Sequence, residues 1–76
     1  MMDEYAYMDA LIDACREKGY TDVDIQVIGT VAGCEESYNV YGSTQKAFEA
    51  ATEFIKQSSS ADEAISKFVK TIDLSE

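Results

Sequence analysis

The sequence contains no histidine, no proline and no tryptophan, and it has only four glycines and two cysteines. Without histidine, the chain lacks both a side chain that titrates near neutral pH and the commonest transition-metal ligand. Cys15 and Cys34 are too few for a disulfide framework or a zinc site. With so little proline and glycine, we expect compact elements joined by short loops. We expect neither a cofactor nor a metal ion.

Long apolar runs are missing too. No stretch approaches the roughly 18 to 20 apolar residues needed to cross a bilayer. The chain begins Met-Met-Asp-Glu-Tyr, which is acidic where a secretory signal would be basic. We therefore expect a cytoplasmic protein with no membrane partner.

Basic residues are scarce. Fifteen acidic residues against six lysines and arginines give a net charge of −9. Nucleic acid repels such a chain, whereas a basic protein surface attracts it. The charge has two interpretations: it keeps a small protein soluble, or it matches a basic groove on a partner.

The chain is short enough to form one domain, residues 1–76, and its apolar content of 46% argues against disorder. Apolar residues at spacings of three and four predict a first helix over residues 4–18, with Asp3 as its N-cap and Gly19 as its stop. That apolar stripe consists of Tyr5, Met8, Leu11, Ile12 and Cys15.

The next segment changes period. Val23, Ile25 and Val27 alternate with polar residues, which predicts a half-buried strand over residues 23–31. Residues 32–37 then resemble a hairpin loop, and residues 38–41 a returning strand.

Two helices follow. Ser43 or Thr44 caps the first, which runs to about Gln57, and Ser60 with Glu63 forms a capping box for the second. The predicted order is α-β-β-α-α, an α+β fold in which helices cover an antiparallel β-hairpin. The hairpin edges would stay open unless a helix, an extra short strand or a second subunit covers them.

The sequence gives little evidence of a catalytic site. The sequence has no Gly-rich phosphate loop, no GxSxG turn and no HExxH helix. Cys34 precedes Glu35 and Glu36, and such neighbours raise a thiol pKa and weaken the nucleophile. An acyl carrier would need an Asp-Ser-Leu site midway along an all-helical chain, whereas only a scrambled Asp73-Leu74-Ser75 is found. We expect a binding protein and not an enzyme.

The candidate binding residues are carboxylates and one tyrosine. We interpret Glu35 and Glu36 as the strongest candidates, because adjacent like charges on a hairpin tip have no structural purpose there. A second pair, Asp62 and Glu63, starts the last helix, where the helix dipole also explains it. A third pair, Asp9 and Asp13, lies on the first helix with its members one turn apart. An exposed tyrosine would add cation–π contacts to a basic surface. These further candidates are Asp62, Glu63, Asp9, Asp13 and Tyr41.

Three stretches resemble the small anti-CRISPR proteins of the type II-A class. Residues 10–21 resemble the end of that family's first helix, residues 35–40 its acidic turn, and residues 62–74 its last helix and tail. The resemblance implies an inhibitor, encoded by a phage or mobile element, that acts in the host cytoplasm. Such proteins bind a guide-RNA-loaded CRISPR nuclease and place carboxylates where DNA would meet its reading Arg and Lys residues.

By position, this role would fall to Glu35, Glu36, Asp62 and Glu63. The alternative is an acidic interaction module, such as an antitoxin or a regulatory subunit, that masks a basic surface of another partner. In either case the protein would not contact nucleic acid directly, and it would be a monomer or a small homo-oligomer.

Overall fold

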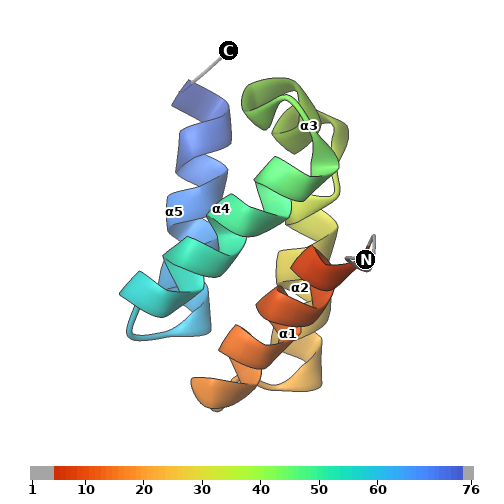
Figure 1. Ribbon diagram of the computed structural model, residues 1–76. Coiled ribbons are helices and arrows are strands. Elements are labelled where there is room, and N and C mark those ends of the chain that lie inside the picture. Colours follow the sequence, from red (N-terminus) through yellow and green to blue (C-terminus); the bar gives the residue numbers. More distant parts are fainter. Residues whose placement is uncertain (1–4, 75–76) are drawn as a thin grey trace.

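The computed structural model describes residues 5–74, which form five helices (Figure 1). These are α1 (Ala6–Glu17), α2 (Asp22–Ala32), α3 (Glu35–Tyr41), α4 (Thr44–Gln57) and α5 (Ala61–Leu74). The described part of the chain contains no strand. The expected α+β fold with a hairpin is therefore wrong, and these residues form an all-α fold.

The segment predicted as the first strand is helix α2, and its start explains why. Thr21 Oγ1 accepts a hydrogen bond from the Asp24 amide, while Asp24 Oδ2 accepts one from the Thr21 amide, each at 3.1 Å. This reciprocal capping box satisfies two amides that a helix start would leave unpaired. Ile28 and Ala32, four residues apart, then turn into the core. The alternation of β-branched residues is overridden by this cap and by tertiary packing.

The predicted hairpin loop and second strand become a tight corner followed by helix α3. Gly33 ends α2, and Cys34 is the N-cap of α3. The buried Ser37 hydroxyl donates to the Val31 carbonyl at 2.7 Å, and the same carbonyl accepts from the Cys34 amide at 3.3 Å, so both bonds join the end of α2 to the start of α3. Gly42 then ends α3 in the left-handed region, with φ of 90°.

The remaining helices agree with the predicted ones to within a few residues. Helix α1 ends as expected at Gly19 (φ 77°), where the Gly19 and Tyr20 amides bond back to the Arg16 and Cys15 carbonyls, each at 3.0 Å. Ser43 caps α4 by accepting from the Lys46 amide. The predicted cap Asp3 lies outside the described residues.

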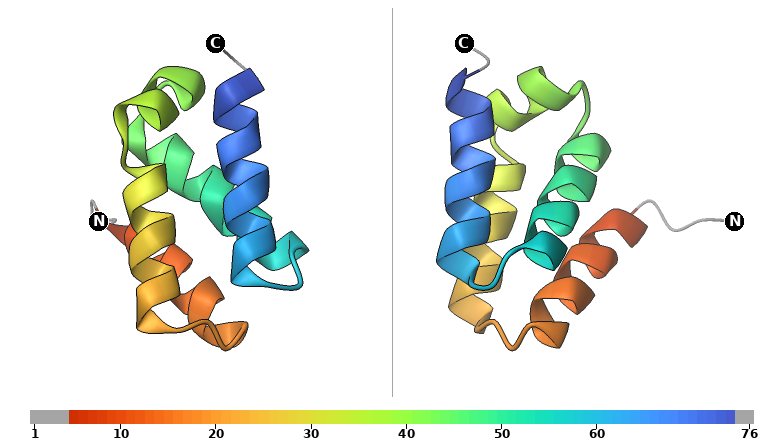
Figure 2. Two further views of the ribbon diagram at one scale, coloured as in Figure 1. Left: turned by 180° about the vertical axis from the view of Figure 1, so that it is seen from behind. Right: turned by 90° about the vertical axis from the view of Figure 1, so that its left-hand side faces the viewer.

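Helix α4 is the centre of the fold. It crosses the middle of the molecule, with α1 on one side and α5 on the other, while α2 and α3 complete the bundle (Figures 1 and 2). Phe48 of α4 packs on Tyr7 with ring centroids 5.4 Å apart, and Phe68 of α5 packs edge-on against Phe54 at 5.9 Å. The largest fully buried apolar side chains are Leu11 and Ile55. Nearly all of this core comes from α1, α4 and α5.

Candidate functional site

The acidic residues predicted as a binding site do not form one patch. Asp9 and Asp13 lie on α1, Glu35 and Glu36 start α3, and Asp62 and Glu63 start α5. Helix α3 lies at one end of the molecule, and the start of α5 lies at the other (Figures 1 and 2). A single partner surface would have to be large to contact all three clusters.

Helix α1 carries a row of three acids. Asp9, Asp13 and Glu17 are spaced by four residues, so their side chains follow one another at about 6 Å along the helix axis. All three are exposed, because Leu11 and Cys15 direct the opposite face of α1 into the core. Within residues 5–74 the ion pairs are Lys56–Glu53 and Lys67–Glu63, so none involves this row. Glu17 was missed as a candidate, although extending the four-residue spacing by one turn would have found it.

Glu35 and Glu36 occupy the first turn of α3 rather than a hairpin tip. Both side chains are exposed. The positive end of the helix dipole favours acidic residues at this position. The interpretation that these charges have no structural purpose is therefore wrong, although their exposure leaves them accessible to a partner.

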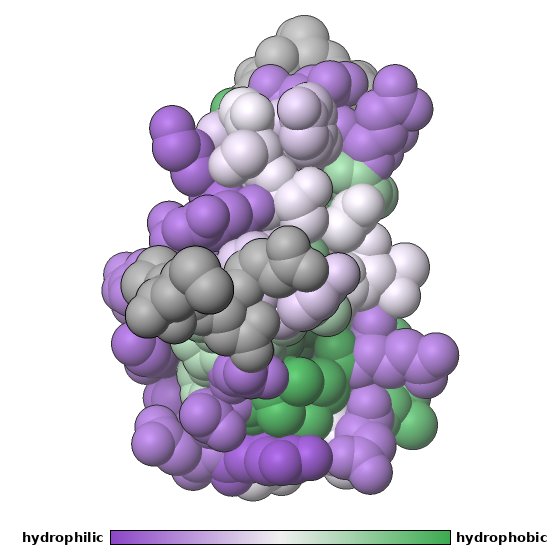
Figure 3. Space-filling model, turned by 45° about the vertical axis from the view of Figure 1, so that its right-hand side comes forward, coloured by the Kyte–Doolittle hydropathy of each residue, from purple (hydrophilic) through white to green (hydrophobic). Residues whose placement is uncertain are grey.

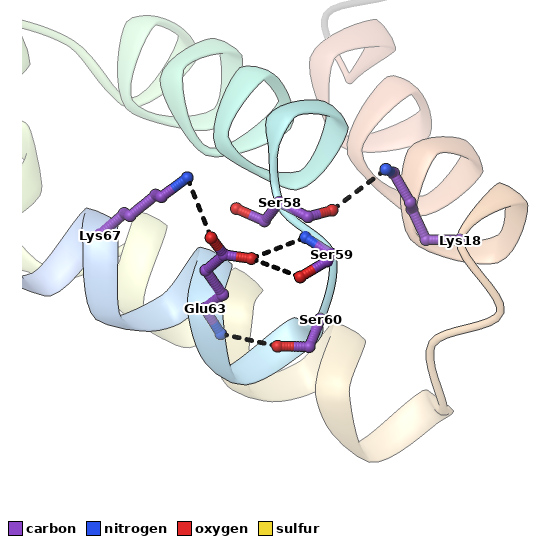
Figure 4. A network of polar contacts seen from close by, with 6 residues as sticks. All are labelled: Lys18, Ser58, Ser59, Ser60, Glu63 and Lys67. Carbon is purple, nitrogen blue, oxygen red and sulfur yellow. Dashed lines mark hydrogen bonds and ion pairs between the residues drawn. The ribbon is translucent and has the colours of Figure 1, made fainter.

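Glu63 is held in a local network at the corner between α4 and α5 (Figure 4). Its Oε2 accepts hydrogen bonds from the Ser59 amide at 2.7 Å and from the Ser59 hydroxyl at 2.8 Å, and its Oε1 pairs with Lys67 at 3.4 Å. These hydrogen bonds, followed by Lys67, lower the pKa of Glu63 to about 2. The predicted capping box is thus shifted: the Ser60 hydroxyl does cap the Glu63 amide, but the carboxylate binds Ser59.

The same corner is tied to α1. Lys18 Nζ donates to the Ser58 carbonyl at 3.1 Å, and the Ser58 side chain is buried (Figure 4). Glu63 therefore has a structural role at this corner, whereas its exposed neighbour Asp62 remains available for binding.

The tyrosines are arranged differently from expectation. Tyr41 was expected to be exposed, but it is half-buried and stacks on Phe68 with ring centroids 5.5 Å apart. Burial raises the pKa of Tyr41, and a contact with the Thr71 hydroxyl offsets this in part. Tyr38 is 52% exposed, and Tyr5, expected on the apolar stripe of the first helix, is 54% exposed. The helical path of residues 35–41 turns Ser37 inward and leaves Tyr38 outside.

A hollow between α1 and α2 forms an apolar groove of about 280 Å³. Figure 3 shows a green region in the lower part of the molecule, with purple, polar side chains beside and below it. Leu11 and Phe48, both buried, form its deep part, and its walls come from both helices. The wall residues are Met8 and Ile12 on α1, and Ile25, Gln26, Gly29 and Thr30 on α2.

The two cysteines, Cys15 and Cys34, lie in different surroundings. Cys15 is fully buried, and burial followed by the nearby Asp24 raises the pKa of its thiol. Cys34 Sγ lies 3.4 Å from the Ser37 hydroxyl.

Among residues 5–74, no three His, Cys, Asp or Glu side chains are grouped as they would be to bind a metal ion. No helix in the described range is long and apolar enough to cross a membrane.

The chain matches no protein-family model, no curated protein and no solved structure at a significant level. Its function must therefore be inferred from its own residues.

Proposed function

We propose that this protein is a non-catalytic inhibitor that mimics DNA and occupies a basic, DNA-reading surface of a partner protein in the cytoplasm. The acidic row on α1, consisting of Asp9, Asp13 and Glu17, is the observation that carries the proposal. Its spacing of about 6 Å is comparable with that of neighbouring phosphates on one nucleic-acid strand. Arg and Lys residues that bind phosphates would pair with these carboxylates instead.

The exposure of the row supports the proposal further. No ion pair within residues 5–74 neutralises its three carboxylates, and the helix fixes their spacing before any partner arrives. Preorganised charges lose little conformational entropy on binding. Glu35 and Glu36 provide a second exposed pair, on the first turn of α3.

The target class comes from the sequence resemblance, which implies a type II CRISPR nuclease. One of the three resembling stretches, residues 35–40, was expected to be an acidic hairpin turn and is helix α3 instead. The inhibitor proposal therefore depends on the arrangement of the exposed carboxylates. That the target is a CRISPR nuclease is a separate proposal.

A competition assay tests both the inhibitor proposal and the proposed target class. Labelled target DNA is bound to each of several guide-loaded type II CRISPR nucleases, and the protein is added at micromolar excess. We expect release of the DNA from at least one nuclease. The protein incubated with the labelled DNA alone should leave its anisotropy unchanged, because both are negatively charged. If every nuclease keeps its DNA, the inhibitor proposal should be abandoned.

The apolar groove between α1 and α2 favours a second candidate, an acidic interaction module such as an antitoxin or a regulatory subunit. DNA has no apolar segment to fill such a groove, whereas a protein partner has. In this candidate the acids attract and orient the partner, and the groove supplies the apolar contact.

A further inference from the structure

We propose that the groove between α1 and α2 binds an amphipathic helix of a partner protein, with lysines and arginines beside its apolar stripe. The inference shares with the proposed function only the assumption of a basic partner. It adds a binding mode, in which apolar anchors at spacings of three, four and seven residues enter the groove.

The shape of the groove supports a helical segment as the occupant. Its walls are two helices, and its volume of about 280 Å³ lies just below the roughly 300 to 1,000 Å³ typical of small-molecule pockets. It would hold the anchor side chains of a helix better than a whole ligand. Met8 remains 37% exposed at its margin, whereas Leu11 and Cys15 of the same apolar stripe are almost fully buried. Gly29 leaves it open, because apart from the adjoining residues and the backbone of α2 no atom lies within 4 Å of the position that a Cβ would occupy there.

The charge around the groove selects a basic occupant. Helices α1 and α2 together carry five acids, Asp9, Asp13, Glu17, Asp22 and Asp24, against the single base Arg16. By helical register, Asp9 lies one turn before Ile12 on α1, and Asp22 lies one turn before Gln26 on α2. Each wall of the groove therefore has an acid beside its lining residues. A second copy of this chain, with a net charge of −9, would be repelled.

The test uses three labelled peptides of about 18 residues, measured by fluorescence anisotropy in about 0.15 M NaCl. The first is a helical peptide with a leucine stripe and a lysine face. The second is its scramble, with the same composition and no stripe. The third keeps the stripe and replaces lysine by glutamate. We expect the first to bind at least about tenfold more tightly than either control, since burial of one leucine alone accounts for such a factor.

Two variants locate the binding. Gly29→Leu fills the groove from within, and the open space at Gly29 together with the better helix propensity of leucine leaves the fold intact. It should weaken binding of the first peptide at least about tenfold. Val27→Leu on the same helix lies outside the groove and should bind as the wild type does. Thermal melts of both variants confirm folding.

Several results would overturn the inference. Equal binding of the scrambled peptide would mean that charge alone attracts it, and equal binding by Gly29→Leu would place the site elsewhere. Self-association of the wild type that Gly29→Leu abolishes would make a second copy the occupant. A tenfold gain in peptide affinity on deleting residues 1–4 would make the chain's own segment the occupant. None of these results depends on DNA competition. A protein that binds the peptide but never displaces DNA contradicts the inhibitor proposal alone.

Discussion

The Glu63 carboxylate accepts hydrogen bonds from both the amide and the hydroxyl of Ser59, at 2.7 and 2.8 Å. These bonds favour the charged form, and the pKa falls from 4.5 to about 2. A lowered pKa means that the carboxylate stabilises the fold above pH 4.5, and that this stabilisation is lost as the pH falls toward 2. The corner between α4 and α5 should therefore weaken in acid.

Glu63→Gln tests this effect. At pH 7 the variant should melt at a lower temperature than the wild type, and the difference should shrink progressively between about pH 4.5 and pH 2, where the wild type also loses its charge. Glu53→Gln, which removes an exposed carboxylate 3.9 Å from Lys56, is the control and should change little at either pH. A pH-independent difference for Glu63→Gln would show that the carboxylate charge is not what stabilises the corner.

The buried aromatic residues should dominate stability. Phe48 and Phe68 are 7% and 3% exposed, and a Phe→Ala change in a core costs about 3 to 5 kcal/mol. A domain of this length has roughly 4 to 11 kcal/mol in total, so either change should remove at least about a quarter of its stability. Phe54→Ala should cost less, because that side chain is only half-buried.

Urea titration followed by circular dichroism measures these costs. Tyr38→Ala is the control, since its side chain is 52% exposed and its loss should cost about 0.5 kcal/mol or less. If Phe68→Ala unfolds at the same urea concentration as Tyr38→Ala, the described core is wrong.

Two glycines should respond to alanine in opposite directions. Gly42 has φ of 90°, where an alanine side chain is strained, so Gly42→Ala should destabilise the protein by about 1 to 2 kcal/mol. Gly29 lies inside α2 with open space at its Cβ position, so Gly29→Ala should stabilise it by up to about 1 kcal/mol. Thermal melts of the pair decide the matter. A stabilising Gly42→Ala would contradict the helix end described there.

Added salt should stabilise the protein. Within residues 5–74 the Lys56–Glu53 pair is exposed and the Lys67–Glu63 pair is partly exposed, so the two offset little of the repulsion that a net charge of −9 creates. The Debye length falls from about 30 Å at 0.01 M to about 8 Å at 0.15 M, which screens that repulsion. We expect the melting temperature to rise between these concentrations of NaCl. A melting temperature that falls would mean that the acids are paired in the folded state.

The sequence predicted α1, α4 and α5 because each has an unambiguous helical period and a recognisable cap or stop. Those ends are marked by Gly19 after Lys18, by Ser43 before Thr44 and by Ser60 before Ala61. Residues 22–41 were misassigned because β-branched residues at alternate positions imitate a strand over a short window. The cap of Thr21 with Asp24 was present in the sequence and was the signal that favoured a helix.

The candidate site was predictable only in part. The charge and the spacing of Asp9 and Asp13 follow from the sequence, since α1 was placed correctly. The stacking of Tyr41 on Phe68 depends on packing between helices distant in the sequence. The bonds from Ser59 to Glu63 join residues only four apart, but they depend on how the chain turns between α4 and α5. The groove was not predicted, because a strand over residues 23–31 would not have placed Ile25 and Gly29 along one helical wall facing α1.

The most direct test of the proposed function compares two double variants that each remove two charges four residues apart. Asp9→Asn/Asp13→Asn shortens the row on α1, and Glu49→Gln/Glu53→Gln removes a matched exposed pair on α4. The measurement is the concentration of each variant that displaces labelled DNA from a nuclease that the wild type inhibits. Two well-formed pairs with Arg contribute at least about 3 kcal/mol, so the α1 variant should need about a hundredfold more protein, whereas the α4 variant should stay within about twofold of the wild type. Equal loss in the two variants would show that only net charge matters, and it would contradict the assignment of the α1 row as the binding surface.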